Sequence, residues 1–429
     1  MREDFTALLE QHFRSNLEGV SPLQKAIREK AWEHFVAKGL PTKKLPGYQY
    51  FPFSHFYQES YELAGLPPLP KEQIETLIHP ECRRSHVIFV NGQYNPELSD
   101  TSALPKEVVV LRLRDALTRY GNFLQLRLSR AMKEESDPFA TLNTALIQMG
   151  LFIYVPPKVV VEAPIQCLHL ISNDRAALVH PRIHFFVGKQ AKLQWIYDHH
   201  CFKDFEYFSN GVTDIALEEG AEFTQYGALT PCQSGWCFEA TRATLKQDSH
   251  FKSITTTTGT KSVRQDFRVS LLGENATCDL KSLSLLNEHR QSHVNVHIDH
   301  MAPHCTSHQL FKNVLTDAAR SSFEGKIYVH SEAQKTLAYQ LNNNLLLSDR
   351  AVANSKPNLE IFADDVKASH GATTGQPNKE HLHYLKTRGI DTKAANLLLL
   401  SGFCIDVLSD ISFLPARERM QSLVEKFLK

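Results

Sequence analysis

The chain between residues 151 and 375 is a series of short strands separated by similar turns, with almost no helical periodicity. Polar and apolar residues alternate within the strands, as in Leu193-Gln-Trp195. Four successive turns end at positions that are 30, 29 and 26 residues apart, namely Ala191, Ala221, His250 and Ala276. Evenly spaced turns without intervening helices predict the stacked coils of a β-solenoid, although a β-sandwich with long hairpins gives a similar pattern.

Helical patterns lie on both sides of this strand-rich region. Ser21 is expected to cap a helix before it, and Asn378 and Asp391 are expected to begin two helices after it. The flanking helices are expected to cap the two open ends of the stacked coils. The predicted class is mainly β, and the predicted parts are a mainly helical N-terminal region (1–150), a β-helix core (151–375) and a C-terminal helical domain (376–429).

The charge balance limits what the chain is expected to bind. Its 429 residues include 47 lysines and arginines and 47 aspartates and glutamates, so the formal net charge is zero. Nucleic-acid-binding proteins normally carry a basic surplus, so that class is not favoured. No apolar run approaches the roughly 20 residues that cross a bilayer, and the first residues lack the apolar core of a secretion signal. These features predict a cytoplasmic protein that binds neither nucleic acid nor membranes.

The sequence carries no nucleotide-binding or nucleophile motif. The stretch 255–262 resembles a phosphate loop, but Thr260 separates Gly259 from Lys261, whereas the loop requires the lysine directly after a glycine. Neither a G-x-S-x-G elbow nor a G-x-G-x-x-G fingerprint occurs. The chain is therefore not expected to be an enzyme by itself.

Cysteines and histidines are the residues most suited to metal chemistry here. The eight cysteines are scattered and lack the two-residue spacing of zinc ribbons, which predicts reduced, structural thiols. In the segment 291–300, His293 and His297 share one strand face with Asn295 and Asp299, while three apolar side chains share the other. The polar face is either the solvated side of a half-buried strand or a metal-binding row.

The segment 360–371 concentrates further reactive side chains. Asp364 and Asp365 would point to opposite faces of a strand, so they could not act as a carboxylate pair. One aspartate with His370 could form an acid–base pair, as on carbohydrate-cleaving β-helices. Alternatively, the small residues around His370 suit close approach by another chain or by a metal.

Several longer motifs resemble one known family. They are Asp299–Ser307, Phe323–Val329, Asn342–Ser348, Pro357–Thr373 and Tyr384–Ile390. In this order they are similar to the SufB/SufD family, subunits of the SUF scaffold that assembles iron–sulfur clusters. Within the family, the A-D-D-V-K-x-S-H-G form of the segment around His370 is more similar to SufD than to SufB.

The resemblance implies a right-handed parallel β-helix between N- and C-terminal helical regions. It implies that a SufB-like subunit pairs through the β-helix and that a SufC-like ATPase docks on the C-terminal helices. The cysteine that SufB uses for cluster building aligns with Asn342, and the SufD histidine at the subunit interface aligns with His370. Ala368 stands where many SufD proteins have a cysteine. Flavin binding is implied for the complex alone, and an isolated chain could form a homodimer.

The resulting hypothesis is a non-catalytic scaffold subunit in a SufB–SufC–SufD complex. In it, His370 would offer an imidazole nitrogen to iron or to a transient iron–sulfur cluster shared with the SufB-like subunit. Cys305 is a secondary candidate ligand, with a structural role as its alternative. Two rival hypotheses are a polysaccharide hydrolase or lyase on a β-helix, and a plain interaction module in which His370 has no ligand role.

Overall fold

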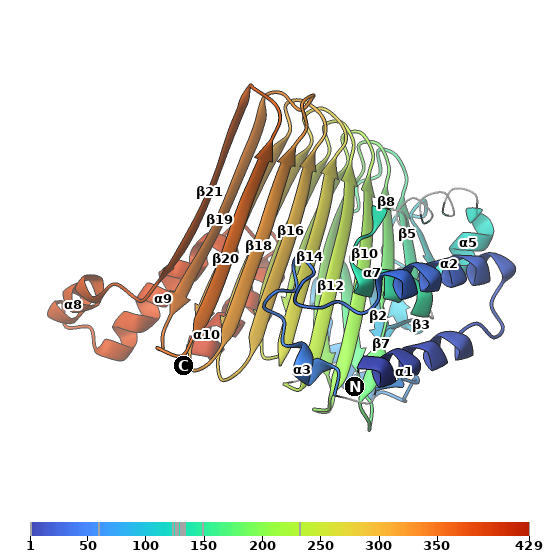
Figure 1. Ribbon diagram of the computed structural model, residues 1–429, viewed down its shortest axis with the longest axis horizontal. Coiled ribbons are helices and arrows are strands. Elements are labelled where there is room, and N and C mark those ends of the chain that lie inside the picture. Colours follow the sequence, from blue (N-terminus) through green and yellow to red (C-terminus); the bar gives the residue numbers. More distant parts are fainter. Residues whose placement is uncertain are drawn as a thin grey trace.

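The computed structural model confirms that the middle of the chain is a parallel β-solenoid (Figure 1). Successive strands of its coils alternate between two facing sheets. A strand pairs in parallel with the strand of the next coil, as Gln291 pairs with Arg320, 29 positions later in the sequence. A β-sandwich built from hairpins would pair consecutive strands antiparallel, so that alternative is wrong. The structure describes residues 2–58, 61–121, 124, 128, 134–147, 150–230 and 233–428.

The two sheets are named A and B here, and the space between them is called the lumen. Sheet A contains β1 (Glu62–Leu63), β4 (Val109–Arg112), β5 (Leu151–Val155), β7 (Ala177–Val179), β8 (Arg182–Val187), β10 (Tyr207–Leu217), β12 (Gly235–Leu245), β14 (Ser262–Leu271), β16 (Gln291–His300), β18 (Arg320–Val329) and β20 (Val352–Ile361). Sheet B contains β2 (His86–Val90), β3 (Gln93–Asp100), β6 (Ile165–Ile171), β9 (Lys192–Cys201), β11 (Glu222–Leu229), β13 (His250–Thr258), β15 (Thr277–Leu286), β17 (Thr306–Leu315), β19 (Thr336–Leu346) and β21 (Val366–Gly375). At the N-terminal end, the sheets finish in the antiparallel pairs β4–β5 and β2–β3.

Helices precede and follow the solenoid, as the sequence predicts. They are α1 (Arg2–Ser15), α2 (Pro22–Lys38), α3 (Phe53–Phe56), α4 (Lys71–Leu77), the 3-10 helix η1 (Pro80–Cys82), α5 (Leu113–Arg119), α7 (Pro138–Leu146), α8 (Lys379–Thr387), α9 (Thr392–Leu408) and α10 (Leu414–Leu428). The side chains of Ser21, Asn378 and Asp391 accept hydrogen bonds from first-turn amides, so the three predicted caps are confirmed. Within the described ranges, no helix has the length and apolarity that a membrane span requires.

The turns before the strands of sheet B share one backbone conformation. Gln190, Asp248 and Asn275 have φ angles of 57°, 55° and 59°, in the left-handed region where aspartate and asparagine are enriched. Each is followed by a small buried residue, respectively Ala191, Ser249 and Ala276. The regular turn spacing in the sequence therefore reflects one turn geometry repeated in successive coils.

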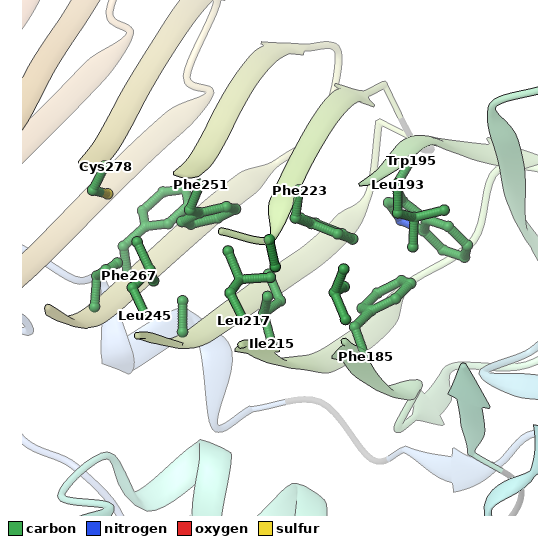
Figure 2. Close-up of a cluster of buried hydrophobic side chains, with 14 of the residues drawn as sticks. Phe185, Leu193, Trp195, Ile215, Leu217, Phe223, Leu245, Phe251, Phe267 and Cys278 are labelled. Atoms are coloured by element: carbon green, nitrogen blue, oxygen red, sulfur yellow. The ribbon is translucent and has the colours of Figure 1, made fainter. Parts of the chain in front are cut away.

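Aromatic and aliphatic side chains fill the lumen of the earlier coils (Figure 2). The rings of Phe185 and Phe223 come from opposite sheets, with centroids 4.8 Å apart, and Phe251 follows Phe223 along sheet B at 6.1 Å. Fully burying one such side chain stabilises the fold by about 1.5–3 kcal/mol. This lumen is the main core of the solenoid.

Helices α1, α2, α3 and α7 cover the outer face of sheet A, while α4 packs on sheet B (Figure 1). Phe56 of α3 and Phe139 of α7 pack on Phe208 and Phe238 of β10 and β12, with ring centroids 4.8–5.7 Å apart. A second, aromatic core is thus formed outside the lumen. It holds α3 and α7 beside the strands of sheet A.

The C-terminal helices cover the outer face of sheet B, which corrects the expectation that they cap the last coil. Leu400 and Val407 of α9 and Met420 of α10 belong to one buried cluster with Ile254 and Leu283 of sheet B. The tail therefore runs back along the solenoid, because its apolar residues match the apolar outer face of β9 to β17. Helix α8 has no buried residue and projects away from the sheets (Figure 1).

Candidate functional site

The last coil, β20 and β21, ends the solenoid with two uncovered strand edges. β20 pairs with β18 and β21 pairs with β19, while no strand in the described part of the chain pairs with their outer edges. Each strand has ten residues. Unpaired N–H and C=O groups along such edges are a template for pairing with another chain. We call the lumen-facing side chains of this coil, together with its strand edges, the end surface.

His370 lies on the end surface. It pairs in register with Gln340 of β19, so the two side chains share the face of sheet B that points into the lumen. Gln340 is buried and donates a hydrogen bond of 2.9 Å to Gln309 in the preceding coil. His370 is exposed because no further coil covers it. The structure thus leaves this histidine accessible on the uncovered side of the last coil.

Small residues leave space around His370. Ala368 and Ala372 occupy the same face of β21, two positions to either side. Across the lumen, Gly325 packs so tightly against Gln340 that a Cβ atom there would lie 2.3 Å from its Nε2 atom. In the last coil, Pro357 of β20 pairs in register with Gly325, and His370 of β21 pairs in register with Gln340. On β21 the imidazole is therefore flanked by the short side chains of two alanines.

Asn342, which aligns with the cluster-building cysteine of SufB, is buried in the lumen beneath the end surface. Its amide donates to the Phe311 carbonyl at 3.1 Å, and its side-chain oxygen accepts bonds from Ser355 at 2.5 Å and from Asn344 at 2.9 Å. This asparagine joins the last two coils by hydrogen bonds, so its position has a structural role in this chain.

Cys305, the secondary candidate, takes the place of the small buried residue in a turn. It follows His304, whose φ is 60°, just as Ala276 follows Asn275. Its thiol donates to the carbonyl of Gly273 at 3.2 Å, and burial raises its pKa to about 11. A thiol held by this hydrogen bond inside a turn of the repeating kind favours the structural alternative.

The aspartates near His370 are not arranged for acid–base catalysis with it. Asp364 and Asp365 are exposed in the bend before β21 and not within a strand. His370 lies five residues beyond Asp365, which corresponds to about 16 Å in an extended strand. A general acid and base that act on one bond must both lie within reach of it.

The histidine-rich strand β16 confirms the predicted alternation of faces. Val294, Val296 and Ile298 point into the lumen core. The opposite face is not uniformly solvated, because His293 lies buried beside Phe51 of the N-terminal segment, with ring centroids 5.5 Å apart. Further along this face, His297 remains half-exposed and bonds to Asp299 at 3.0 Å.

Comparison with known protein families assigns the chain to a family. Residues 169–403 match the family described as "SUF system FeS cluster assembly, SufBD core domain", and residues 1–167 match "SufBD protein N-terminal region". The chain belongs to the SufBD family. The resemblance derived from the motifs is thereby confirmed, and the chain is a SufBD-family iron–sulfur cluster assembly protein.

Curated SufBD relatives are similar over nearly the whole chain. A SufBD family protein of Synechocystis is 27% identical over 98% of this chain and 94% of its own length. The iron–sulfur cluster assembly protein SufD of Escherichia coli is 26% identical, with 94% and 92% covered, and SufD of Bacillus subtilis is 24% identical, with 94% of both covered.

Sequence reasoning missed one cluster of possible metal ligands inside the lumen. His199 of β9 and Cys237 and Glu239 of β12 bring their ligand atoms within 4.8 Å of one another. They come from opposite sheets and are 38 and 40 residues apart, so no local spacing could reveal them.

The prediction that the cysteines are reduced is confirmed for six of the eight and is wrong for Cys201. Cys201 is disulfide-bonded, and Cys232 lies outside the described residues. The six free and buried cysteines are Cys82, Cys167, Cys237, Cys278, Cys305 and Cys404.

Proposed function

We propose that this SufBD-family protein is a SufD-like, non-catalytic scaffold subunit that assembles with a SufB-like subunit and a SufC-like ATPase. The uncovered last coil is the observation that carries the proposal, since it combines free strand edges with an exposed histidine. Relatives named SufD that align along nearly the full length support the SufD-like assignment. Asn342 at the aligned cysteine position supports it as well, because an amide cannot accept sulfur.

The end surface is the proposed contact with the SufB-like subunit. Strand edges of β20 and β21 would pair with strands of a second solenoid, so main-chain hydrogen bonds would supply affinity. Side chains of the end surface would supply specificity. The same edges would let an isolated chain pair with a second copy of itself, which is how a homodimer would form.

His370 is the proposed ligand from this chain for iron or for a transient iron–sulfur cluster. Its imidazole suits first-row metals, and its small neighbours Ala368 and Ala372 leave room for a metal held jointly with a partner. A site completed only at an interface, with few thiolates, favours release of the cluster. Cys305 is assigned a structural role in this proposal, and flavin is left to the assembled complex.

The C-terminal helical domain (376–429) is the proposed docking element for the SufC-like ATPase, beside a core of residues 151–375 and an N-terminal region of residues 1–150. Its outer side keeps large apolar residues exposed, including Tyr384 of α8 and Leu398 and Ile405 of α9. Exposed apolar residues on adjacent helices are typical of a protein contact.

Co-expression with SufB-like and SufC-like partners tests the assembly. Native mass spectrometry is expected to find one copy of this chain, one SufB-like subunit and two SufC-like subunits. A chain that stays alone, or that pairs only with itself, would contradict the proposed assembly and would reopen the enzyme hypothesis.

The ligand role is tested by His370→Ala in the assembled complex. We expect normal assembly and at least about tenfold slower cluster delivery to an apo-client, since one metal ligand is lost. His289→Ala is the matched control, because His289 is an exposed histidine in the turn before β16 and lies away from the end surface. Equal delivery by both variants would leave the chain as an interaction module without a ligand role.

A further inference from the structure

The lumen contains a compact set of nitrogen, sulfur and oxygen atoms, far along the chain from the end surface. The Nε2 atom of His199 lies 3.6 Å from Oε1 of Glu239, and the Sγ atom of Cys237 lies 3.5 Å from the same oxygen. The other ring nitrogen of His199, Nδ1, is 4.0 Å from Cys237 Sγ, and one ligand atom from each of the three residues lies within 4.8 Å of the other two. Ligands of a tetrahedral zinc-like centre are separated by roughly 3.3–3.8 Å, given metal–ligand bonds of about 2.0–2.3 Å. These three side chains are thus nearly spaced for one metal ion.

The Nε2 atom of His199 faces Glu239 but has no hydrogen-bond partner in the described structure. The side chain of His199 is fully buried. A buried polar atom normally has a partner, and neutral imidazole is the form that binds a metal. A metal ion would satisfy this nitrogen.

Glu239 is also missing a positive partner. Other buried carboxylates of the described chain contact arginine, as Asp214 contacts Arg182 at 2.7 Å and Asp266 contacts Arg242 at 2.6 Å. The only ion-pair partner recorded for Glu239 in the described residues is His199, which is charged only if protonated. A divalent cation would provide the compensating charge that arginine provides elsewhere.

The surroundings make space for the carboxylate and for a further ligand. A Cβ atom at Gly211 would lie 2.6 Å from Oε2 of Glu239, so only glycine fits there without displacing the carboxylate. Glu239 also lines a small cavity together with Tyr197 and Gln225. A water in this cavity would approach the metal from the side of Glu239, which is the member of the set that lines it.

We propose that His199, Cys237 and Glu239 bind one divalent first-row transition metal ion, Zn²⁺ or Fe²⁺, in the lumen. The mixed donor set excludes Mg²⁺ and Ca²⁺, which prefer oxygen ligands alone. Binding requires that Cys237 and Glu239 lose their protons, so metal uptake releases protons and is weaker at low pH. The site is separate from the proposed interface role of His370 and does not depend on it.

Cobalt is a suitable probe, because Co²⁺ takes the same geometry and absorbs strongly when a thiolate is bound. The full-length chain, freed of metal and kept reduced and anaerobic, is incubated to equilibrium with Co²⁺ and separately with Zn²⁺ and Fe²⁺. We expect one bound ion per chain and a thiolate-to-cobalt charge-transfer band that Zn²⁺ or Fe²⁺ abolishes by displacement. The relative potency of these two ions in displacing cobalt identifies the preferred metal.

The variant Cys237→Ala is expected to lose the charge-transfer band and to bind at least about tenfold more weakly. Cys278→Ala is the matched control, because Cys278 is another fully buried thiol of the lumen core. Glu239→Gln keeps the shape and the thiolate, so the band should persist while affinity falls at least about tenfold. Absence of stoichiometric binding, a cobalt complex without the band, or a band that survives in Cys237→Ala would each overturn the site.

Discussion

The first coils and the last coil share one strand geometry, but they differ in what covers them. All seven residues of β6 are buried, whereas none of the ten residues of β21 is buried. In the first coils the N-terminal segment covers the strands, as α4 does over β6. The last coil lacks such a cover in the described chain. The repeated coil geometry thus determines the strand register. The helices that pack on the solenoid determine which coils are buried and which remain accessible for contact.

The side chains that fill the lumen also change from the first coils to the last. Aromatic side chains such as Phe223 and Phe251 fill the earlier coils. Towards the end surface, amides replace them, and Gln309–Gln340 and Asn313–Asn344 pairs bond at 2.9 and 2.7 Å. A paired amide adds only about 0.5–1.5 kcal/mol, while a buried phenylalanine adds about 1.5–3 kcal/mol. Stability is therefore concentrated in the earlier coils.

The strongest way to break this comparison is to remove apolar volume from each region. Phe223→Ala is expected to lower the free energy of unfolding by about 3–5 kcal/mol, because it opens a cavity in the aromatic lumen. Leu359→Ala, in β20 of the last coil, is expected to cost about 1 kcal/mol or less, because its side chain is only partly buried. Urea unfolding of the full chain measures both values. Equal losses would contradict the division between a stable region and a free one.

A pH experiment sharpens the comparison with a smaller effect. Burial, with a contribution from nearby Arg264, lowers the pKa of His293 to about 3. The unfolded chain then binds a proton that the folded chain refuses, so stability is lost as the pH falls below about 6.5. At pH 5 the loss from this histidine is about 2 kcal/mol. His293→Gln should lose that much less stability than the wild type between pH 7.5 and pH 5.

The matched control for this experiment is His370→Gln in the last coil. Its imidazole is exposed, so the variant should follow the wild-type pH dependence of unfolding. If both variants changed the pH dependence alike, the difference in cover between the two histidines would have no energetic consequence.

The solenoid was predictable because its signals are local. The turns before β9, β13 and β15 use a left-handed residue followed by a small buried one, and this pattern recurs in the sequence at nearly fixed intervals. Side-chain alternation also assigned the lumen face of β16 correctly. The caps at Ser21, Asn378 and Asp391 are equally local. His370 could be placed in advance only through its family motif.

Features that depend on how coils close could not be predicted. The apolar residues of α9 and α10 predict that each helix has a buried face. They do not indicate that this face packs on sheet B and not on the last coil. His199 and Glu239 meet only because β9 and β12 face each other across the lumen. Nothing in their separation along the chain distinguishes such a pair from two unrelated residues.

The most direct test of the account is amide hydrogen exchange in this chain, alone and with a SufB-like subunit. We predict that amides of β20 and β21 exchange quickly in the isolated monomer and become protected in the complex, while those of β6 and β8 stay protected in both. Complex formation without new protection in β20 and β21 would contradict the claim that the last coil is the docking surface.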